Sequence, residues 1–135
     1  MRTVIVGEAD ADMREAEALV LEAMAAAEAA IKPGVATGVA DAAARAVIAR
    51  NRFGATQYTR VGYGIGIACT PGWGEGHIID IKPGDTRLFE ENMCFHLIPF
   101  LQIPEKAAVG ISASIRVTAN GCESIQDFER KLFVV

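Results

Sequence analysis

A tyrosine set between glycines is the first candidate for chemistry in this sequence. Tyr63 lies between Gly62 and Gly64 in the segment "RVGYGIGIACTPGWGE", residues 60–75. Glycines within a strand weaken it, and their recurrence indicates close approach of another backbone or of a ligand. We expect the Tyr63 hydroxyl to bind a substrate or to donate a proton. The alternative is a half-buried strand aromatic with a packing role only.

The segment "MCFHLIP", residues 93–99, contributes a histidine to the same list. Side chains alternate along a strand, so Cys94, His96 and Ile98 share one face. An imidazole in a cleft can act as a general base near neutral pH, which makes His96 a candidate catalytic residue. Cys94 is a candidate ligand-binding residue on that face. The alternative is a histidine that is hydrogen-bonded within the sheet.

Trp73 and Glu75 follow the glycine run in the turn "PGWGE". An aromatic face beside a carboxylate recognises cations, so this pair predicts a guanidinium-like or amidinium-like ligand, with Glu75 as a candidate catalytic residue. The alternative is a surface turn whose tryptophan covers the core. No Ser-His-Asp or Cys-His arrangement suited to nucleophilic catalysis stands out.

Composition limits the partners that we expect. The net charge is −4 and the 13 basic residues form no cluster, which argues against nucleic acid or an anionic membrane as a partner. No apolar run approaches the roughly 20 residues that cross a bilayer. Cys69, Cys94 and Cys122 are far apart and predict free thiols in a reducing compartment. We therefore expect one cytoplasmic domain, residues 1–135.

Strand and helix patterns predict an α+β fold. An apolar stripe of Met13, Val20, Met24, Ala27 and Ile31 predicts a helix over residues 8–34, ended by "KPG". A second helix is predicted over 39–51, with Thr37 as its cap and Ala43, Val47 and Arg50 along one side. Strands are predicted at 2–7, 59–67, 77–81, 93–101, 109–117 and 131–135. The two helices should cover one face of an antiparallel sheet.

Five segments in order resemble the catalytic domain of the pita-bread family. That family includes methionine aminopeptidase, prolidase, aminopeptidase P, creatinase and ectoine hydrolase. "RT" with "VG", "AEAAIKPGV", "VGYGIGI", "FEENMCFHLIP" and "IRVTANGCESI" are similar to its "RTfavG", "aaikPGv", "GHGIG", "lepGMvftiEP" and "vlVTenGceilT". The creatinase and ectoine hydrolase branch looks closest. The resemblance implies half of a pita-bread fold, the C-terminal half, with two helices packed on a curved antiparallel sheet.

The family's peptidases hold two metal ions with two aspartates, one histidine and two glutamates. By the resemblance, the histidine falls on Tyr63, one glutamate on Ile98, and the other on Ser112, or on Ala113 if the register slips by one. A second catalytic histidine falls on Thr70. The two aspartates precede the "RT" strand in the family and have no counterpart here. We therefore expect no metal and no other cofactor, with Ser112 as a candidate ligand-binding residue.

Two functions follow from this resemblance. The chain is expected to be a truncated creatinase-like or ectoine hydrolase-like protein that cleaves C–N bonds without metal or is inactive on its own. The alternative is a non-enzymatic half-domain that acts as a dimeric binding or scaffold module. An isolated half exposes the surface that meets its partner half, so a homodimer is expected. The ligand implied is a small amidine-like, guanidine-like or dipeptide-like molecule.

Overall fold

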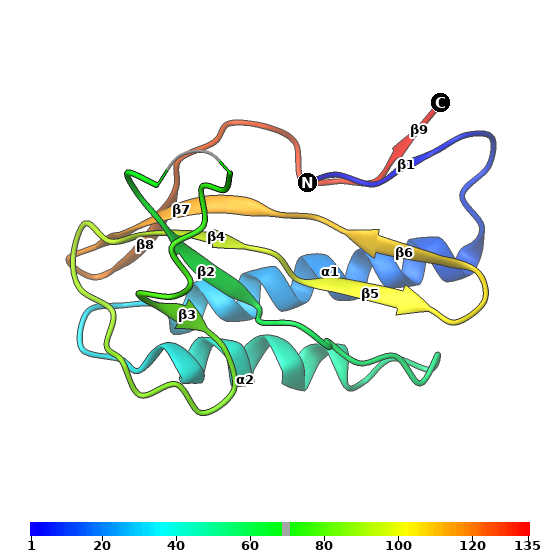
Figure 1. Cartoon of the computed structure of the whole chain (residues 1–135). Coiled ribbons are helices and arrows are strands. Elements are labelled where there is room, and N and C mark those ends of the chain that lie inside the picture. Colours follow the sequence, from blue (N-terminus) through cyan, green and yellow to red (C-terminus); the bar gives the residue numbers. More distant parts are fainter. Residues whose placement is uncertain (69–70) are drawn as a thin grey trace.

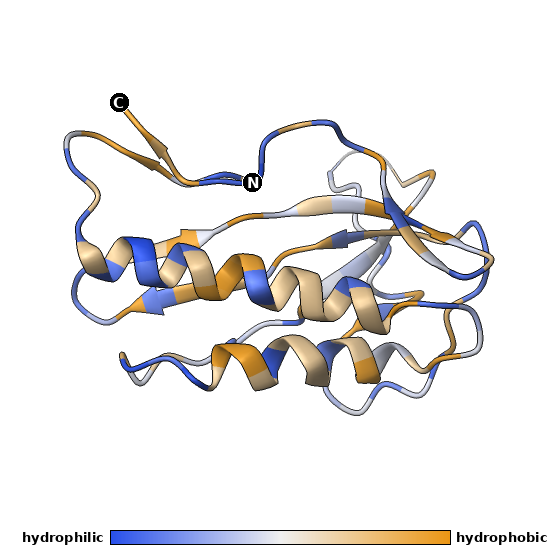
Figure 2. Cartoon of the chain, turned by 180° about the vertical axis from the view of Figure 1, so that it is seen from behind, coloured by the Kyte–Doolittle hydropathy of each residue, from blue (hydrophilic) through white to orange (hydrophobic). Residues whose placement is uncertain are grey.

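Two long helices lie side by side and cover one face of a sheet. The computed structural model describes residues 1–68 and 71–135. Helix α1 runs over Ala11–Ala30 and α2 over Thr37–Ile48, and Figure 1 shows both on the same side of the strands. Figure 2 shows the same helices from behind, where they lie in front of the strands. The α+β prediction is confirmed.

The central sheet has five strands in the order β3-β2-β4-β7-β8, and all its pairs are antiparallel. Two smaller sheets accompany it: β5 pairs with β6 antiparallel, and β1 pairs with β9 in parallel. The strands are β1 (Val4–Ile5), β2 (Gly62–Ile65), β3 (Asp80–Ile81), β4 (Cys94–Leu97), β5 (Phe100–Ile103), β6 (Ala107–Gly110), β7 (Ala113–Thr118), β8 (Gly121–Ser124) and β9 (Phe133–Val134).

Helix α1 forms as its sequence predicts, although it is shorter at both ends. The Asp10 side chain accepts a hydrogen bond from the Met13 backbone at 3.0 Å and so caps the first turn. The helix ends before Pro33, and Gly34 takes a positive φ of 83° that suits glycine. The whole predicted apolar stripe, from Met13 to Ile31, is buried.

One detail predicted for α2 is wrong. Thr37 is its first residue rather than its cap, and the cap position belongs to Ala36, which has no side chain that could cap. Of the residues predicted along one side, Val47 is buried, Ala43 is half-buried and Arg50 is exposed. Arg50 forms an ion pair with Glu22 of α1 instead.

The predicted strands at 93–101 and 109–117 each divide into two. Pro99, which has no backbone N–H, separates β4 from β5, and the facing chain divides between β6 and β7. The two facing segments therefore pair in the central sheet as β4 with β7, and in a smaller sheet as β5 with β6. The short strand β8 pairs with β7 and was not predicted, because its sequence "GCES" follows the turn "TANG" and lacks alternation.

Strand alternation gives the central sheet two different faces. Phe95, Leu97, Ala113 and Ile115 are buried on the side that the helices cover, which we call the helix-facing side. Cys94 and His96 are only partly buried and point to the other side, which we call the far face. In Figure 1 the chain ends β1 and β9 lie beyond this far face.

Candidate functional site

Tyr63 and His96 meet on the far face because their strands place them directly opposite each other. They are Cα partners in the antiparallel pairing of β2 with β4. The Tyr63 hydroxyl lies 2.8 Å from Nδ1 of His96, and the two rings meet edge-on with centroids 5.3 Å apart. The register between β2 and β4 thus brings together two of the candidate catalytic residues, which lie on separate strands.

Ser112 joins the same group from the start of β7. Its Oγ lies 2.8 Å from Nε2 of His96, so both imidazole nitrogens have a hydroxyl partner. Ser112 is only 1% exposed. The amino group of Met1 also donates to its Oγ, and the Arg2 guanidinium donates to its carbonyl oxygen at 2.6 Å. We call Tyr63, His96 and Ser112 the far-face network.

The Trp73 indole adds one hydrogen bond to this network. Its indole N–H can only donate, and it lies 3.2 Å from the Tyr63 hydroxyl oxygen. The hydroxyl hydrogen is then free to point at Nδ1 of His96, which leaves the proton on Nε2 to face Ser112. This is a neutral imidazole. Burial lowers the pKa of His96, and the nearby amino group of Met1 lowers it further.

A pocket of about 440 Å³ opens beside the far-face network. Tyr63, His96 and Ile98 border it on one side, and β6 and the start of the chain border it on another. Its lining residues are Met1, Arg2, Thr3, Thr59, Tyr63, His96, Ile98, Phe100, Ala108 and Gly110. Its volume suits a small molecule rather than a polymer.

The structure places Glu75 and Cys94 at a different pocket of about 330 Å³. The Glu75 carboxylate accepts a hydrogen bond from the Ala68 backbone at 3.2 Å, and the Cys94 thiol faces the Asn92 carbonyl at 3.7 Å. Trp73, 65% exposed, instead bonds Tyr63. The six predicted site residues therefore fall into two groups.

The glycines beside Tyr63 allow other chain segments to pack closely on the side of β2 opposite to the Tyr63 side chain. A Cβ on Gly62 would lie 3.0 Å from the His96 carbonyl oxygen, and one on Gly64 would lie 2.8 Å from the side chain of Ile79. The segment 75–81 runs along this edge, with Glu75 N bonded to Gly64 O at 2.7 Å. Close approach of another chain segment, one of the two options predicted, accounts for these glycines.

Sequence reasoning missed Arg2 and the other cations near the pocket. In the sequence Arg2 stands out only as part of the "RT" string, and no pattern marks it as lining a pocket. The Arg60 guanidinium lies 4.8 Å above the Tyr63 ring and pairs with Asp80 at 3.1 Å. Thr70, predicted to replace a histidine, lies outside the described residues.

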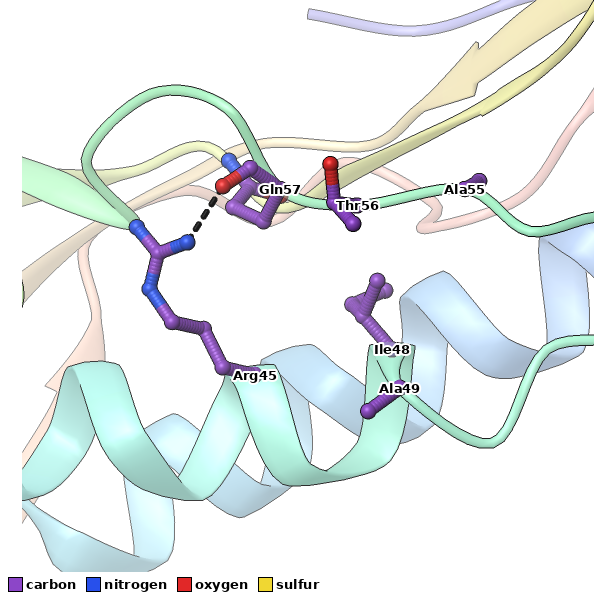
Figure 3. A pocket seen from close by; sticks show the side chains of 6 residues that line it. All are labelled: Arg45, Ile48, Ala49, Ala55, Thr56 and Gln57. Atoms are coloured by element: carbon purple, nitrogen blue, oxygen red, sulfur yellow. Dashed lines mark hydrogen bonds between the residues drawn. The ribbon is translucent and has the colours of Figure 1, made fainter.

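A third pocket lies between the end of α2 and the segment 55–57, as Figure 3 shows. It measures about 180 Å³ and is mostly apolar. The charged group that lines it, Arg45, is already engaged by Asp41 at 2.6 Å and by the carbonyls of Gln57 and Thr59. Arg45 thus holds residues 57–59 against α2. Thr59 of this segment lines the 440 Å³ pocket.

The thiol of Cys122 is not a candidate nucleophile. It lies 3.5 Å from the Glu28 carbonyl oxygen, and burial raises its pKa to about 11. The protonated form therefore dominates at neutral pH, and thiols react as thiolates.

Comparison with known proteins places this fold in a family. Residues 1–119 match the family described as metallopeptidase family M24. The chain belongs to metallopeptidase family M24. Over 134 residues the M24 chain is 37% identical to the ectoine hydrolase of Halomonas elongata, covering 98% of this chain and 33% of that protein. It is 35% identical to an uncharacterized peptidase of Staphylococcus saprophyticus, covering 96% of this chain and 35% of that protein.

Solved structures of M24 proteins share the fold. The prolidase from Thermococcus sibiricus superposes with a TM-score of 0.86 at 25% identity, over 99% of this chain and 35% of that protein. The X-Pro aminopeptidase from Thermotoga maritima gives a TM-score of 0.82 at 27% identity, over 98% and 36%. The predicted pita-bread fold is confirmed, and this M24 chain spans about a third of the length of the relatives it matches.

The residues present in this M24 chain do not fit a divalent-ion site. Of the positions that the resemblance assigns to metal ligands, Ile98 has no donor atom, and the hydroxyls of Tyr63 and Ser112 are both bonded to His96. Ala113, the alternative to Ser112, is buried in the core. Within residues 1–68 and 71–135, no cluster of three or more His, Cys, Asp and Glu side chains could hold a metal ion.

Neither helix in the described part of the chain is both long enough and apolar enough to cross a bilayer.

Proposed function

We propose that this M24 chain forms part of a metal-independent hydrolase that cleaves a C–N bond in a small molecule. The observation that carries the proposal is the far-face network, which lies beside a 440 Å³ pocket. Two of its members, Tyr63 and Ser112, fall by the resemblance on positions of metal ligands in the family's peptidases. The 37% identity to a protein named ectoine hydrolase supports this reaction class.

The proposed chemistry uses Tyr63 and His96 as a proton-transfer pair. When the Tyr63 hydroxyl turns from Nδ1 to the substrate nitrogen, the Nδ1 lone pair becomes free to take a proton from water. The hydroxide then adds to the carbon, the C–N bond breaks, and Tyr63 gives its proton to the leaving nitrogen. The proton on His96 returns to Tyr63 along their 2.8 Å contact, which restores the starting state.

The test compares matched variants, since the chain has two tyrosines and two histidines. Tyr63→Phe and His96→Gln should each lower hydrolysis of ectoine, creatine or an Xaa-Pro dipeptide by about 100-fold or more. Tyr58→Phe and His77→Gln alter exposed side chains and should leave the rate unchanged. Turnover that depends on added Mn²⁺ or Co²⁺, or that survives in Tyr63→Phe, would refute the proposal.

A second candidate function rests on a different observation. The paired strands β1 and β9, with the residue that follows each, expose Val4, Val6, Val134 and Val135, and an isolated two-stranded sheet is marginally stable in water. We propose that this edge meets a second copy in a homodimer that binds a small ligand without turning it over. Two copies related by a twofold axis would imitate the two similar halves that the resemblance gives the family domain.

Light scattering distinguishes the proposed homodimer from a monomer. The wild-type chain should give the mass of a dimer at micromolar concentration, and a double variant Val6→Lys with Val135→Lys should give a monomer. Ile67→Lys, at an exposed apolar position outside β1 and β9, is the control and should remain dimeric. A wild-type monomer at these concentrations would argue against the dimer.

A further inference from the structure

Three neighbouring strands set Asp80, Tyr63 and His96 in one row across the far face. Tyr63 of β2 is the Cα partner of Asp80 in β3 and of His96 in β4. Side chains of directly opposed residues point to the same side of a sheet, so the Asp80 carboxylate lies on the same side as the far-face network. Asp80 is only 6% exposed. A nearly buried carboxylate therefore lies one strand away from Tyr63, on the side opposite to His96.

Arg60 connects this carboxylate to the ring of Tyr63. Its Nη1 donates to the Asp80 carboxylate, 3.1 Å from Oδ1 and 3.4 Å from Oδ2. The guanidinium carbon lies 4.8 Å from the centroid of the Tyr63 ring, which is within the range of a cation–π contact. Arg60 is not among the described residues that line the 440 Å³ pocket. It therefore contacts Tyr63 without reaching a ligand in that pocket.

The positive charge over the ring is not cancelled by Asp80. Nζ of Lys82 also lies 3.7 Å from Oδ2 of Asp80, so two cations share this carboxylate and one positive charge remains in excess. Gly76 leaves room for the ion pair, because a Cβ on it would lie 2.5 Å from Nη1 of Arg60 and closer still to the Asp80 carboxylate. The guanidinium is thus held in place over the ring.

A guanidinium over a phenol ring favours the loss of the phenolic proton. The cation is attracted to the ring face, and the attraction grows when the ring gains negative charge. The same polarisation strengthens the Tyr63 hydroxyl as a donor to Nδ1 of His96, 2.8 Å away. In the proposed reaction Tyr63 gives its proton to the leaving nitrogen, and a positive charge at its ring favours that step.

We propose that Arg60 is a positioning residue that acts through Tyr63: its guanidinium, held by Asp80, makes the Tyr63 hydroxyl a stronger proton donor. This inference deepens the proposed function and rests on it for the part that Tyr63 plays in turnover. The effect of Arg60 on the phenol does not need turnover, and it can be measured without substrate. An arginine that only held β3 against β2 would have no effect on His96.

The first measurement follows the two tautomers of His96 by ¹⁵N NMR in the whole chain. A weaker donor at Nδ1 makes a proton on Nδ1 less unfavourable, so Arg60→Gln should raise the share of that tautomer about 3-fold, toward its share in Tyr63→Phe. Arg52→Gln is the matched control, since Arg52 lies over the Phe53 ring at the same 4.8 Å and pairs with carboxylates of α1. It should leave the tautomers as in wild type. A tautomer ratio that Arg60→Gln leaves unchanged would overturn the inference.

Fluorination separates the acidity of the phenol from the packing of its ring. 3-Fluorotyrosine is a more acidic phenol of similar size, and in a Tyr58→Phe background it enters only at position 63, because the chain has two tyrosines. It should bring the tautomer ratio of Arg60→Gln back to within about 2-fold of wild type. No recovery would mean that Arg60 acts on the ring by packing, which contradicts the inference.

The wild-type chain supplies a test that holds even if Arg60→Gln is unfolded by circular dichroism. The Cδ protons of Arg60 should be shifted upfield by the ring current of Tyr63, and Tyr63→Phe, which keeps the ring, should preserve the shift. Arg60 signals at their ordinary positions in wild type would refute the contact, and with it the inference.

Turnover provides the second readout. Arg60→Gln should lower kcat about 3- to 10-fold and change KM less than about 2-fold, because Arg60 does not line the described pocket. Arg60→Lys keeps the charge and should retain at least about half of kcat. A changed tautomer ratio in a chain without turnover would support the inference and refute the hydrolase. Turnover whose kcat and tautomer ratio are both unaffected by Arg60→Gln would support the hydrolase and refute the inference.

Discussion

The helix-facing side and the far face of the central sheet come from the same strands but carry different kinds of side chains. In β4, Phe95 and Leu97 are fully buried under the helices, while His96 between them points to the far face and has two hydroxyl partners. The helix-facing side is apolar and closely packed. The far face carries a connected polar group beside a pocket.

This difference separates the residues that hold the fold from those that could do chemistry. Burial of apolar area supplies most of the stability, and it is concentrated on the helix-facing side. The hydrogen bonds of the far-face network each add a smaller net amount, because water would otherwise satisfy the same groups. Changes on the far face should therefore alter binding or rate more than stability.

Neighbouring substitutions in β4 test this separation most strongly. Phe95 lies edge-on to Phe89 with ring centroids 5.2 Å apart, and both are buried. Phe95→Ala should lower the free energy of unfolding by about 3–5 kcal/mol. His96→Ala at pH 8 should lower it by about 1–3 kcal/mol, since two partner hydroxyls lose a hydrogen bond. Urea unfolding measures both, and equal losses would contradict the separation.

A matched pair of glycine substitutions tests the packing behind Tyr63. Gly62→Ala places a methyl group 3.0 Å from both the His96 carbonyl oxygen and the Leu97 side chain, so we expect a loss of about 1–3 kcal/mol. Gly72→Ala has open space around its Cβ and should stay within about 0.5 kcal/mol of wild type. Thermal and urea unfolding provide the comparison. A neutral Gly62→Ala would mean that this edge of β2 is looser than the structure indicates.

The helix-facing side was largely predictable, and the far face only in part. The spacing of Met13, Val20 and Met24 is enough to place α1 on the sheet, because helix periodicity fixes which side is apolar. Alternation likewise placed His96 on the face opposite Phe95. The pairing of Tyr63 with His96 could not be read from alternation, because it depends on the register between two strands far apart in the sequence.

The contacts of Arg2 were beyond prediction for the same reason. They join the first residues of the chain to Ser112, which directly precedes β7, and to the carbonyls of residues 128 and 129. Backbone carbonyls leave no trace in side-chain patterns. The separation of Glu75 from Trp73 has a different cause, because the two side chains take different nearby partners, Ala68 N and the Tyr63 hydroxyl respectively.

The pH dependence of stability tests the role of His96 on the far face, and we expect an effect of intermediate size. The pKa of His96 is lowered in the folded protein, so the unfolded chain binds the proton more tightly. Its contribution to stability is therefore complete above the ordinary value of 6.5 and is lost as the pH falls from there through the folded pKa. Wild type should lose more stability than His96→Gln between pH 8 and pH 5. Parallel curves for the two proteins would mean that His96 titrates normally.

The smallest effect is expected at Trp73, which donates a hydrogen bond to Tyr63 of the far-face network. Trp73→Phe removes one N–H donor from the Tyr63 hydroxyl at a largely exposed position, so the free energy of unfolding should fall by less than about 1 kcal/mol. The contact between Tyr63 and His96 does not need this donor to persist, and ¹⁵N NMR should still find the proton of His96 on Nε2. Tyr63→Phe serves as the reference, because Nδ1 then loses its partner and the two tautomers become closer in population. A proton found on Nδ1 in Trp73→Phe would show instead that the Trp73 indole fixes the His96 tautomer through Tyr63.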